Sequence, residues 1–277
     1  MPFAQIGDIR LYYVEEGTGP LVVMLHGFPE FWYSWRKQIP VIAAAGFRVL
    51  APDLRGYGQT SRPREVDAYR LSQIVGDIAG LIVENGGRAT VIGHDWGGFV
   101  AWYLAMMHPS LVERLIILDA PHPKTLAREL HRTFKQKWRF LYQVFFNIPF
   151  ISEATVWLVL PWFLRRMGRF TPDEIDVYRK VWRQPGAIWP MLAYYRASFR
   201  SSAELRSLLR RIDAPTLFIF GDRDQVFTLA TLNGMEKEVP NIRVERIASA
   251  AHFVQTDAPD VVNRLILEFL ATPPTAR

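Results

Sequence analysis

The chain has 277 residues, a net charge of +6 and a hydrophobic content of 49%. These values are ordinary for a large globular domain and exclude an intrinsically disordered chain, a collagen and a coiled coil. The absence of Cys excludes a disulfide scaffold, a thiolate nucleophile and Cys-ligated metal centres. The N-terminus shows no basic stretch followed by an apolar segment, and the longest apolar run, 99–107, is too short to cross a bilayer. We therefore expect a cytoplasmic protein without a transmembrane segment.

Apolar runs and turn residues predict the elements in chain order. Residues 9–15 indicate an early strand, and 74–82 and 261–269 keep the 3.6-residue apolar period of helices. A further helix is expected at 98–107. Buried strands are expected at 21–25, 47–51, 89–92, 115–118, 216–220 and about 243–248. Strands that alternate with helices favour an α/β fold with a mostly parallel twisted sheet flanked by helices.

The alternation stops near residue 122 and resumes near 214. Residues 123–212 carry 17 Lys and Arg against 6 Asp and Glu, a balance of +11, and hold five of the nine Trp. The prolines at 149, 161, 172, 185 and 190 are expected to separate several short helices. We predict a core made of 1–122 and 213–277, with a helical insertion at 123–212. Since no nucleic-acid reading module accompanies the basic residues, no nucleic-acid partner is expected.

The segment Gly93-His94-Asp95-Trp96-Gly97 lies between a predicted strand and a predicted helix. Glycines two residues before and two after a central residue are typical of a nucleophile elbow, a strained turn that exposes the central side chain. Here that residue is Asp95, in place of the more common Ser. An ordinary Gly-rich turn with Asp95 as a helix N-cap is the alternative.

Other strand ends supply matching groups. Phe28 follows the strand at 21–25, so its backbone N–H and that of Trp96 are candidates for a two-donor oxyanion hole. Asp224 follows the fifth buried strand and His252 follows the sixth. The order nucleophile, acid, histidine at the carboxyl ends of strands is that of a hydrolase triad.

The segments HGFPEFWYSWRKQIP, Ala51-Pro-Asp-Leu-Arg-Gly-Tyr-Gly58 and GHDWGG, with the late His-Phe, resemble the α/β-hydrolase-fold epoxide hydrolases over nearly the whole chain. The resemblance implies the α/β-hydrolase fold, with the insertion as a lid, or cap. It assigns Asp95 as nucleophile, His252 as base and Asp224 as its acid partner. Asp222 and Asp119 are weaker candidates for the acid.

A carboxylate nucleophile displaces a leaving group at an sp³ carbon and forms an alkyl ester, which water then hydrolyses. An epoxide leaves as an alkoxide that needs a proton. Tyr194-Tyr195-Arg196 resembles the lid segment whose Tyr before Arg donates that proton, which points to Tyr195, with Tyr194 as the alternative. The second lid tyrosine of the family is replaced in Phe145-Phe146-Asn147, so ring opening rests on Tyr195 alone, or on Tyr142, one helical turn before Phe145-Phe146.

We therefore predict a hydrolase that converts lipophilic epoxides and water into diols. A haloalkane dehalogenase with the same Asp nucleophile is the alternative, since Trp96 also occurs beside the nucleophile there. A non-catalytic protein that binds hydrophobic ligands comes third. The six His show no paired ligand spacing, and the chemistry needs neither a metal nor another cofactor. A homodimer remains open.

Overall fold

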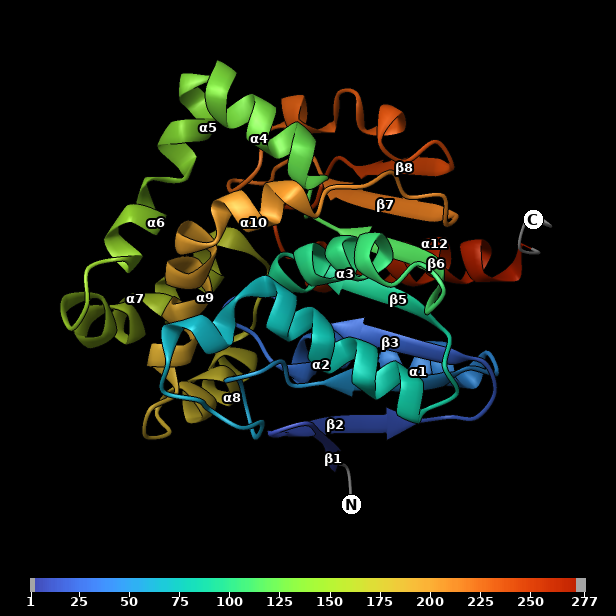
Figure 1. Ribbon diagram of the computed structural model, residues 1–277, viewed down its shortest axis with the longest axis horizontal. Coiled ribbons are helices and arrows are strands. Elements are labelled where there is room, and N and C mark those ends of the chain that lie inside the picture. Colours follow the sequence, from blue (N-terminus) through green and yellow to red (C-terminus); the bar gives the residue numbers. More distant parts are fainter. Residues whose placement is uncertain (1–2, 273–277) are drawn as a thin grey trace.

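A single eight-stranded sheet forms the centre of the computed structural model, which describes residues 3–272 (Figure 1). The strand order is β1-β2-β4-β3-β5-β6-β7-β8. The pairs β1–β2 and β2–β4 are antiparallel, and every other neighbouring pair is parallel. The strands are β1 (Phe3–Ile6), β2 (Ile9–Glu16), β3 (Leu21–Leu25), β4 (Arg48–Pro52), β5 (Ala89–His94), β6 (Val112–Leu118), β7 (Thr216–Gly221) and β8 (Ile242–Ile247).

All the expected strands are present, so the predicted α/β class is confirmed. The differences concern strand ends and β1, an edge strand of four residues that sequence reasoning missed. So short a segment shows little alternation of its own and gains its hydrogen bonds from β2. The helix expected at 74–82 runs from 71 to 84, and beyond its C-cap, Asn85, the Gly87 N–H donates to the Ile82 carbonyl.

Helices cover both faces of the sheet and enclose two hydrophobic cores. On one face lie α2 (Leu71–Glu84) and α3 (Trp96–Met107), and on the other α1 (Ile39–Ala44) and α12 (Pro259–Ala271). Residues of β3 alternate between the two cores, because successive side chains of a strand point to opposite faces. Burial on both faces explains the unbroken apolar run of this strand.

The helices between β6 and β7 form a cap beside the carboxyl ends of the parallel strands, at the left in Figure 1. They are α4 (Pro123–Arg132), α5 (Phe134–Arg139), α6 (Leu141–Phe146), α7 (Ile151–Met167), α8 (Pro172–Trp182), α9 (Ile188–Arg200) and α10 (Ser202–Ser207). The remaining helices are α11 (Val254–Asp257) and short 3₁₀ turns at Trp32–Trp35, Val66–Tyr69, Leu229–Leu232 and Met235–Lys237.

The expectation that Pro161 separates two cap helices is wrong. Pro161 lies inside α7, which continues for 17 residues across it. A proline in a helix interior loses one backbone hydrogen bond, and packing must compensate for that loss. Here Pro161 is buried together with Leu160 and Leu164 on the inner face of α7, which packs against α8 and α9.

Side chains of the core and the cap hold the two parts together. The Trp182 indole donates to the Pro29 carbonyl at 2.8 Å, and the Tyr194 hydroxyl donates to the Arg55 carbonyl at 2.8 Å. The Arg36 guanidinium pairs with Glu174 at 2.5 Å. The cap therefore rests on the loops that follow β3 and β4. Within residues 3–272, no helix is long and apolar enough to span a membrane.

Candidate active site

Asp95 occupies a strained turn between β5 and α3. Its φ is +48°, in the region that residues with a Cβ rarely adopt. A Cβ on Gly93 would collide with the backbone of Gly97, and one on Gly97 would collide with the Leu25 carbonyl. The two glycines are thus required by close backbone packing, and the turn holds Asp95 at the carboxyl edge of the sheet, as the elbow pattern predicted.

The loop after β3 contacts Asp95 directly. The Phe28 N–H donates to Oδ1 of Asp95 at 2.9 Å. A Cβ on Gly27 would come within 2.6 Å of the Asp95 Cβ, so only glycine permits this approach. Trp96, the first residue of α3, lines the cavity in front of Asp95. His26 is structural: it is buried and accepts a hydrogen bond from the Leu54 N–H at 3.0 Å.

His252 lies between two carboxylates. Its Nε2 is 3.6 Å from Oδ2 of Asp95, and its Nδ1 is 3.1 Å from Oδ2 of Asp224. The other oxygen of Asp224 accepts the N–H groups of Val226 and Phe227, which fixes the carboxylate. The three predicted side chains are thus brought together although they are far apart in sequence.

The weaker acid candidates lie elsewhere. Asp222 is on the surface and pairs with Arg246 at 2.7 Å. Asp119 is fully buried, but its two oxygens accept the backbone N–H groups of Gly221 and Val254. Burial and the charge of Asp224 raise the pKa of Asp119 well above its ordinary value. Of the three aspartates, the structure pairs Asp224 with His252.

Electrostatics favour an ion pair between Asp95 and His252. Burial raises the pKa of Asp95, but the hydrogen bond and charge of His252 outweigh it and hold the pKa below its ordinary value. Burial lowers the pKa of His252, but the charge and hydrogen bond of Asp224, together with those of Asp95, raise it well above its ordinary value. These shifts favour an ionised Asp95 carboxylate in the resting site.

Two cap tyrosines lie over Asp95. Tyr195 on α9 and Tyr142 on α6 both line the cavities that reach Asp95, and their ring centroids are 6.1 Å apart. Burial raises the pKa of Tyr195 well above its ordinary value and also raises that of Tyr142, so both phenols keep their protons. The Tyr194 hydroxyl is instead committed to the Arg55 carbonyl. Phe145 and Phe146 line the cavity with apolar surface only.

Two lobes of the cavity meet at Asp95. One lobe, of about 330 Å³, lies beneath α6 and α7 and includes Phe146, Leu160 and Phe163. The other, of about 300 Å³, extends between α3, α4 and α10, and has the polar side chains of Gln143, Ser198 and Arg206 along it. Asp95, Tyr142 and Tyr195 are common to both lobes. A molecule that reacts at Asp95 can therefore extend in two directions.

Sequence reasoning missed a buried polar pair behind the elbow. Glu30 accepts from His94 Nδ1 at 2.9 Å and from the Ser34 hydroxyl at 2.7 Å, and both Glu30 and His94 are fully buried. The other ring nitrogen of His94 is 2.8 Å from the His252 carbonyl oxygen. The pair thus links the loop after β3 to the backbone of His252. The sequence did offer a signal for this pair: Glu30 lies in HGFPE, close to Phe28, and His94 lies in GHDWG, directly before Asp95.

Arg196 was also missed as a support of the cap. It is buried on α9, donates to the Phe146 carbonyl at 3.0 Å and pairs with Glu153 at 2.6 Å. These contacts hold α6 and α7 against the helix that carries Tyr195. The arginine therefore fixes the position of the two cap tyrosines relative to each other.

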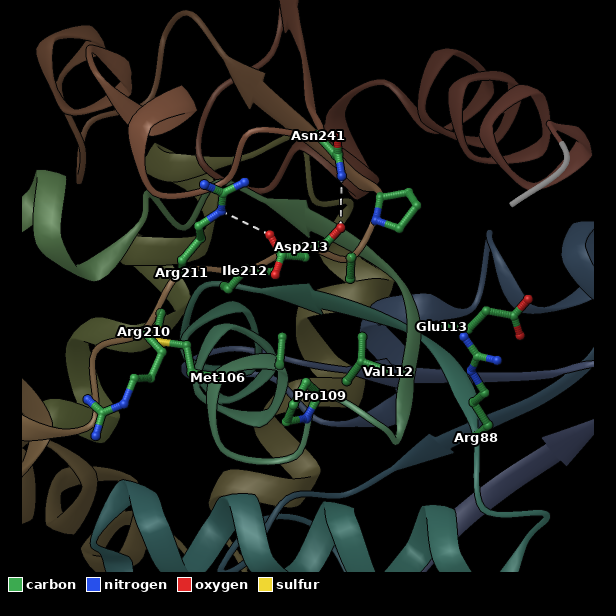
Figure 2. Close-up of a pocket in the computed structure, with 13 residues that line it drawn as sticks. Arg88, Met106, Pro109, Val112, Glu113, Arg210, Arg211, Ile212, Asp213 and Asn241 are labelled. Carbon is green, nitrogen blue, oxygen red and sulfur yellow. Dashed lines mark hydrogen bonds and ion pairs between the residues drawn. The ribbon is translucent and has the colours of Figure 1, made fainter. Parts of the chain in front are cut away.

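A larger cleft, of about 950 Å³, lies at the opposite edge of the sheet (Figure 2). It is bordered by the amino ends of β5, β6 and β7, where Arg88, Val112 and Pro215 lie. Its Arg211 and Asp213 pair with each other at 2.9 Å. None of the triad residues lines this cleft, so size alone does not identify the site. Residues 3–272 contain no cluster of three or more His, Asp or Glu placed to hold a metal ion.

Known proteins share this chain's sequence and fold. The family model of the α/β hydrolase fold matches residues 20–259. The chain is 36% identical to the AB hydrolase superfamily protein YfhM of Bacillus subtilis, over 97% of this chain and 96% of that protein. It is 34% identical to human epoxide hydrolase 4, over 95% of this chain and 76% of that protein. The structure of an epoxide hydrolase from Bacillus megaterium with an inhibitor superposes with a TM-score of 0.87 at 31% identity, covering 98% of this chain and all of that one.

Proposed function

The chain belongs to the epoxide hydrolases of the α/β-hydrolase fold, which are hydrolases of ether bonds, and from this premise we propose that it opens lipophilic epoxides through a covalent ester on Asp95. The observation that supports the proposal is that Asp95, Tyr142 and Tyr195 line one cavity, with the pKa values of both tyrosines raised by burial. An epoxide bound there would meet a carboxylate for its carbon and phenol protons for its oxygen.

In the first step, Asp95 attacks one epoxide carbon and the C–O bond to the ring oxygen breaks. Oδ1 is held by the Phe28 N–H, so Oδ2 is the oxygen that attacks. The leaving oxygen takes a proton from Tyr195, with Tyr142 donating a second hydrogen bond. The product is a hydroxyalkyl ester of Asp95.

In the second step, water attacks the ester carbonyl carbon of Asp95. His252 removes the proton from water, and Asp224 stabilises the imidazolium that forms. Alkylation removes the negative charge of Asp95, which was one of the two charges that raise the pKa of His252. After the ester has formed, the imidazolium therefore gives up its proton, which balances the proton that Tyr195 gave to the leaving oxygen, and the neutral imidazole acts as the base. The Phe28 and Trp96 N–H groups receive the oxyanion. When the ester C–O bond breaks, the leaving alkoxide takes the proton that His252 received from water, and the diol is released; the carboxyl proton of Asp95 then returns to His252 and restores the ion pair.

The cavity defines the substrate class. The lobe beneath α6 and α7 offers aromatic and aliphatic side chains, with Asp95, His252 and the two tyrosines as its polar groups. Such a lining suits aryl or long alkyl epoxides better than small hydrophilic ones, because desolvation of apolar surface supplies the binding energy.

An isotope experiment tests the covalent mechanism. After a single turnover in ¹⁸O water, one labelled oxygen should be found in the Asp95 carboxylate and none in the diol, because water attacks the ester carbonyl. Tryptic peptides and product are analysed by mass spectrometry. Label in the diol alone would mean that water attacks the epoxide directly, and the ester mechanism would be wrong.

The haloalkane dehalogenase alternative is separated by paired assays. Halide ions are stabilised by N–H donors, such as the indole of Trp96, and need no proton, whereas an alkoxide needs an acidic O–H. The two tyrosine hydroxyls thus favour the epoxide. We expect diol from styrene oxide and no halide from a bromoalkane panel. Tight ligand binding without turnover on either panel would instead support the non-catalytic alternative.

A further inference from the structure

The outer surface of the cap is unusually apolar. Of the 16 large hydrophobic side chains that are exposed in the described residues, 12 lie within residues 134–162. Phe150 is 84% exposed, Phe134 76%, and Trp138 and Trp162 65% each. The others are Leu141, Val144, Phe145, Ile148, Ile151, Trp157, Leu158 and Val159. We call these 12 side chains the cap patch.

The patch is the outer face of helices whose inner faces are packed, so it does not result from a poorly packed cap. In α7, Val156, Leu160 and Leu164 are buried, while Trp157, Leu158 and Trp162 point outward. The inner faces of α6 and α7 pack on α9, which carries the catalytic tyrosine. Figure 1 shows α5, α6 and α7 in succession along the outer edge of the cap. Large exposed apolar patches on a folded protein mark a site of interaction.

Positive charge borders this patch. Residues 132–169 contain seven Lys and Arg and one acidic residue, Glu153, which is paired with Arg196. Exposed cations stand beside the apolar side chains, at Lys135 and Lys137 on α5 and at Arg165 and Arg166 on α7. Within residues 3–272 none of these four has an ion-pair partner. The combination of Trp, Phe and Leu with Lys and Arg is that of helices that lie in the interface of an anionic membrane.

The apolar lobe of the active site reaches the same surface. Phe145, Val159 and Trp162 line the lobe and also belong to the cap patch. A compound dissolved in the outer layer of a bilayer against this face would meet the entrance to Asp95 without crossing water.

We propose that the cap patch docks this protein on membranes rich in anionic phospholipid, with the apolar lobe facing the bilayer. The apolar side chains insert among the acyl chains, and the flanking Lys and Arg contact the lipid phosphates. The rest of the chain, outside 123–212, has a net charge of −5, so an anionic surface attracts the cap side and repels the opposite side. Docking on a membrane goes beyond the proposed function. Only the delivery of a lipophilic substrate to Asp95 rests on the proposed function.

Charge argues against a second copy as the occupant of this surface. A symmetric contact through the patch would bring together two caps that each carry a net charge of +11. Within 132–169, each copy has one acidic residue to offset seven Lys and Arg. An anionic lipid surface offers negative charge to the Lys and Arg residues and also covers the exposed apolar side chains of the patch.

The test is co-sedimentation of the full chain with vesicles of phosphatidylcholine, with and without about 30% phosphatidylglycerol, at low and high salt. We expect binding to the anionic vesicles that weakens with salt. Lys135→Glu with Lys137→Glu should reduce binding about tenfold or more, and so should Trp138→Ser with Phe150→Ser. None of these four residues lines the two lobes, so turnover of a water-soluble epoxide should be unchanged.

Matched controls carry the same changes away from the cap patch. Arg88→Glu with Arg210→Glu changes the charge by the same amount at the cleft of Figure 2. Val83→Ser with Val244→Ser removes two exposed apolar side chains that lie outside the cap. These variants should bind as the wild type does. Binding that is absent, or that falls equally in patch and control variants, overturns the proposal. A further outcome would also overturn the proposal: the wild type does not bind vesicles but self-associates in sedimentation velocity, and Trp138→Ser with Phe150→Ser abolishes that self-association. The patch would then be an interface between two copies of the chain. Vesicle binding needs no substrate, so its failure is distinct from a failure of the proposed activity.

Discussion

Replacing the two cap tyrosines by Phe, singly and together, measures the acid in the ring-opening step. Both tyrosines line the cavity at Asp95, so the proposed mechanism gives the substrate alkoxide two donors. Loss of one pre-organised donor to a developing oxyanion costs about 2.7–4 kcal/mol, or roughly 10²–10³ in rate. Because the partner remains, Tyr195→Phe should slow alkylation about 10²-fold. The double variant with Tyr142→Phe should lose about 10⁴-fold, since both donors act in one transition state.

The assay is single-turnover alkylation of Asp95 with enzyme in excess over styrene oxide, followed by acid quench and mass spectrometry of the intact ester. Tyr194→Phe is the matched control, because the same group is removed one residue away. Its hydroxyl donates to the Arg55 carbonyl at 2.8 Å, so this variant should alkylate at the wild-type rate and lose only about 1 kcal/mol of stability.

Two results would refute this reasoning. Wild-type alkylation in Tyr195→Phe would remove that residue from the reaction. A double variant no slower than Tyr195→Phe would show that Tyr142 does not donate to the alkoxide and only lines the cavity.

Three further predictions concern the base, the pH dependence and the core. His252→Gln should form the Asp95 ester and then trap it, visible as a persistent mass increase equal to the epoxide; an ester that still hydrolyses at the wild-type rate would exclude His252 as the base. The pKa of Asp95 is held low, so alkylation should not change between about pH 8 and about pH 6, whereas ester hydrolysis needs neutral His252, whose pKa the Asp224 carboxylate still raises after Asp95 is esterified, and should slow as the pH falls; stopped-flow measurement of each step decides. Asp77→Ala leaves Arg55 buried without its partner and should cost about 3–5 kcal/mol in urea unfolding, against about 0–1 kcal/mol for the exposed Asp67→Ala; equal losses would contradict the argument from burial.

The sequence determined the fold class and the chemical nature of the site because both depend on local patterns. Apolar runs fixed the strands, and the spacing of Gly93 and Gly97 around Asp95 followed from steric limits at one turn. The chain order of Asp95, Asp224 and His252 at strand ends was sufficient to bring them to one edge, since parallel strands end on the same side of the sheet.

Only the tertiary structure decided questions that depend on the direction of a side chain. Asp119, Asp222 and Asp224 all follow strands. Asp119 accepts hydrogen bonds from backbone N–H groups and Asp222 pairs with Arg246, so only Asp224 of the three pairs with His252. Tyr194 and Tyr195 are adjacent in sequence, yet helical geometry turns one toward Arg55 and the other toward Asp95, about 100° apart. The approach of Tyr142 and the Glu30–His94 pair arise from contacts between distant segments. Such contacts depend on how the cap and core pack, which no local pattern encodes.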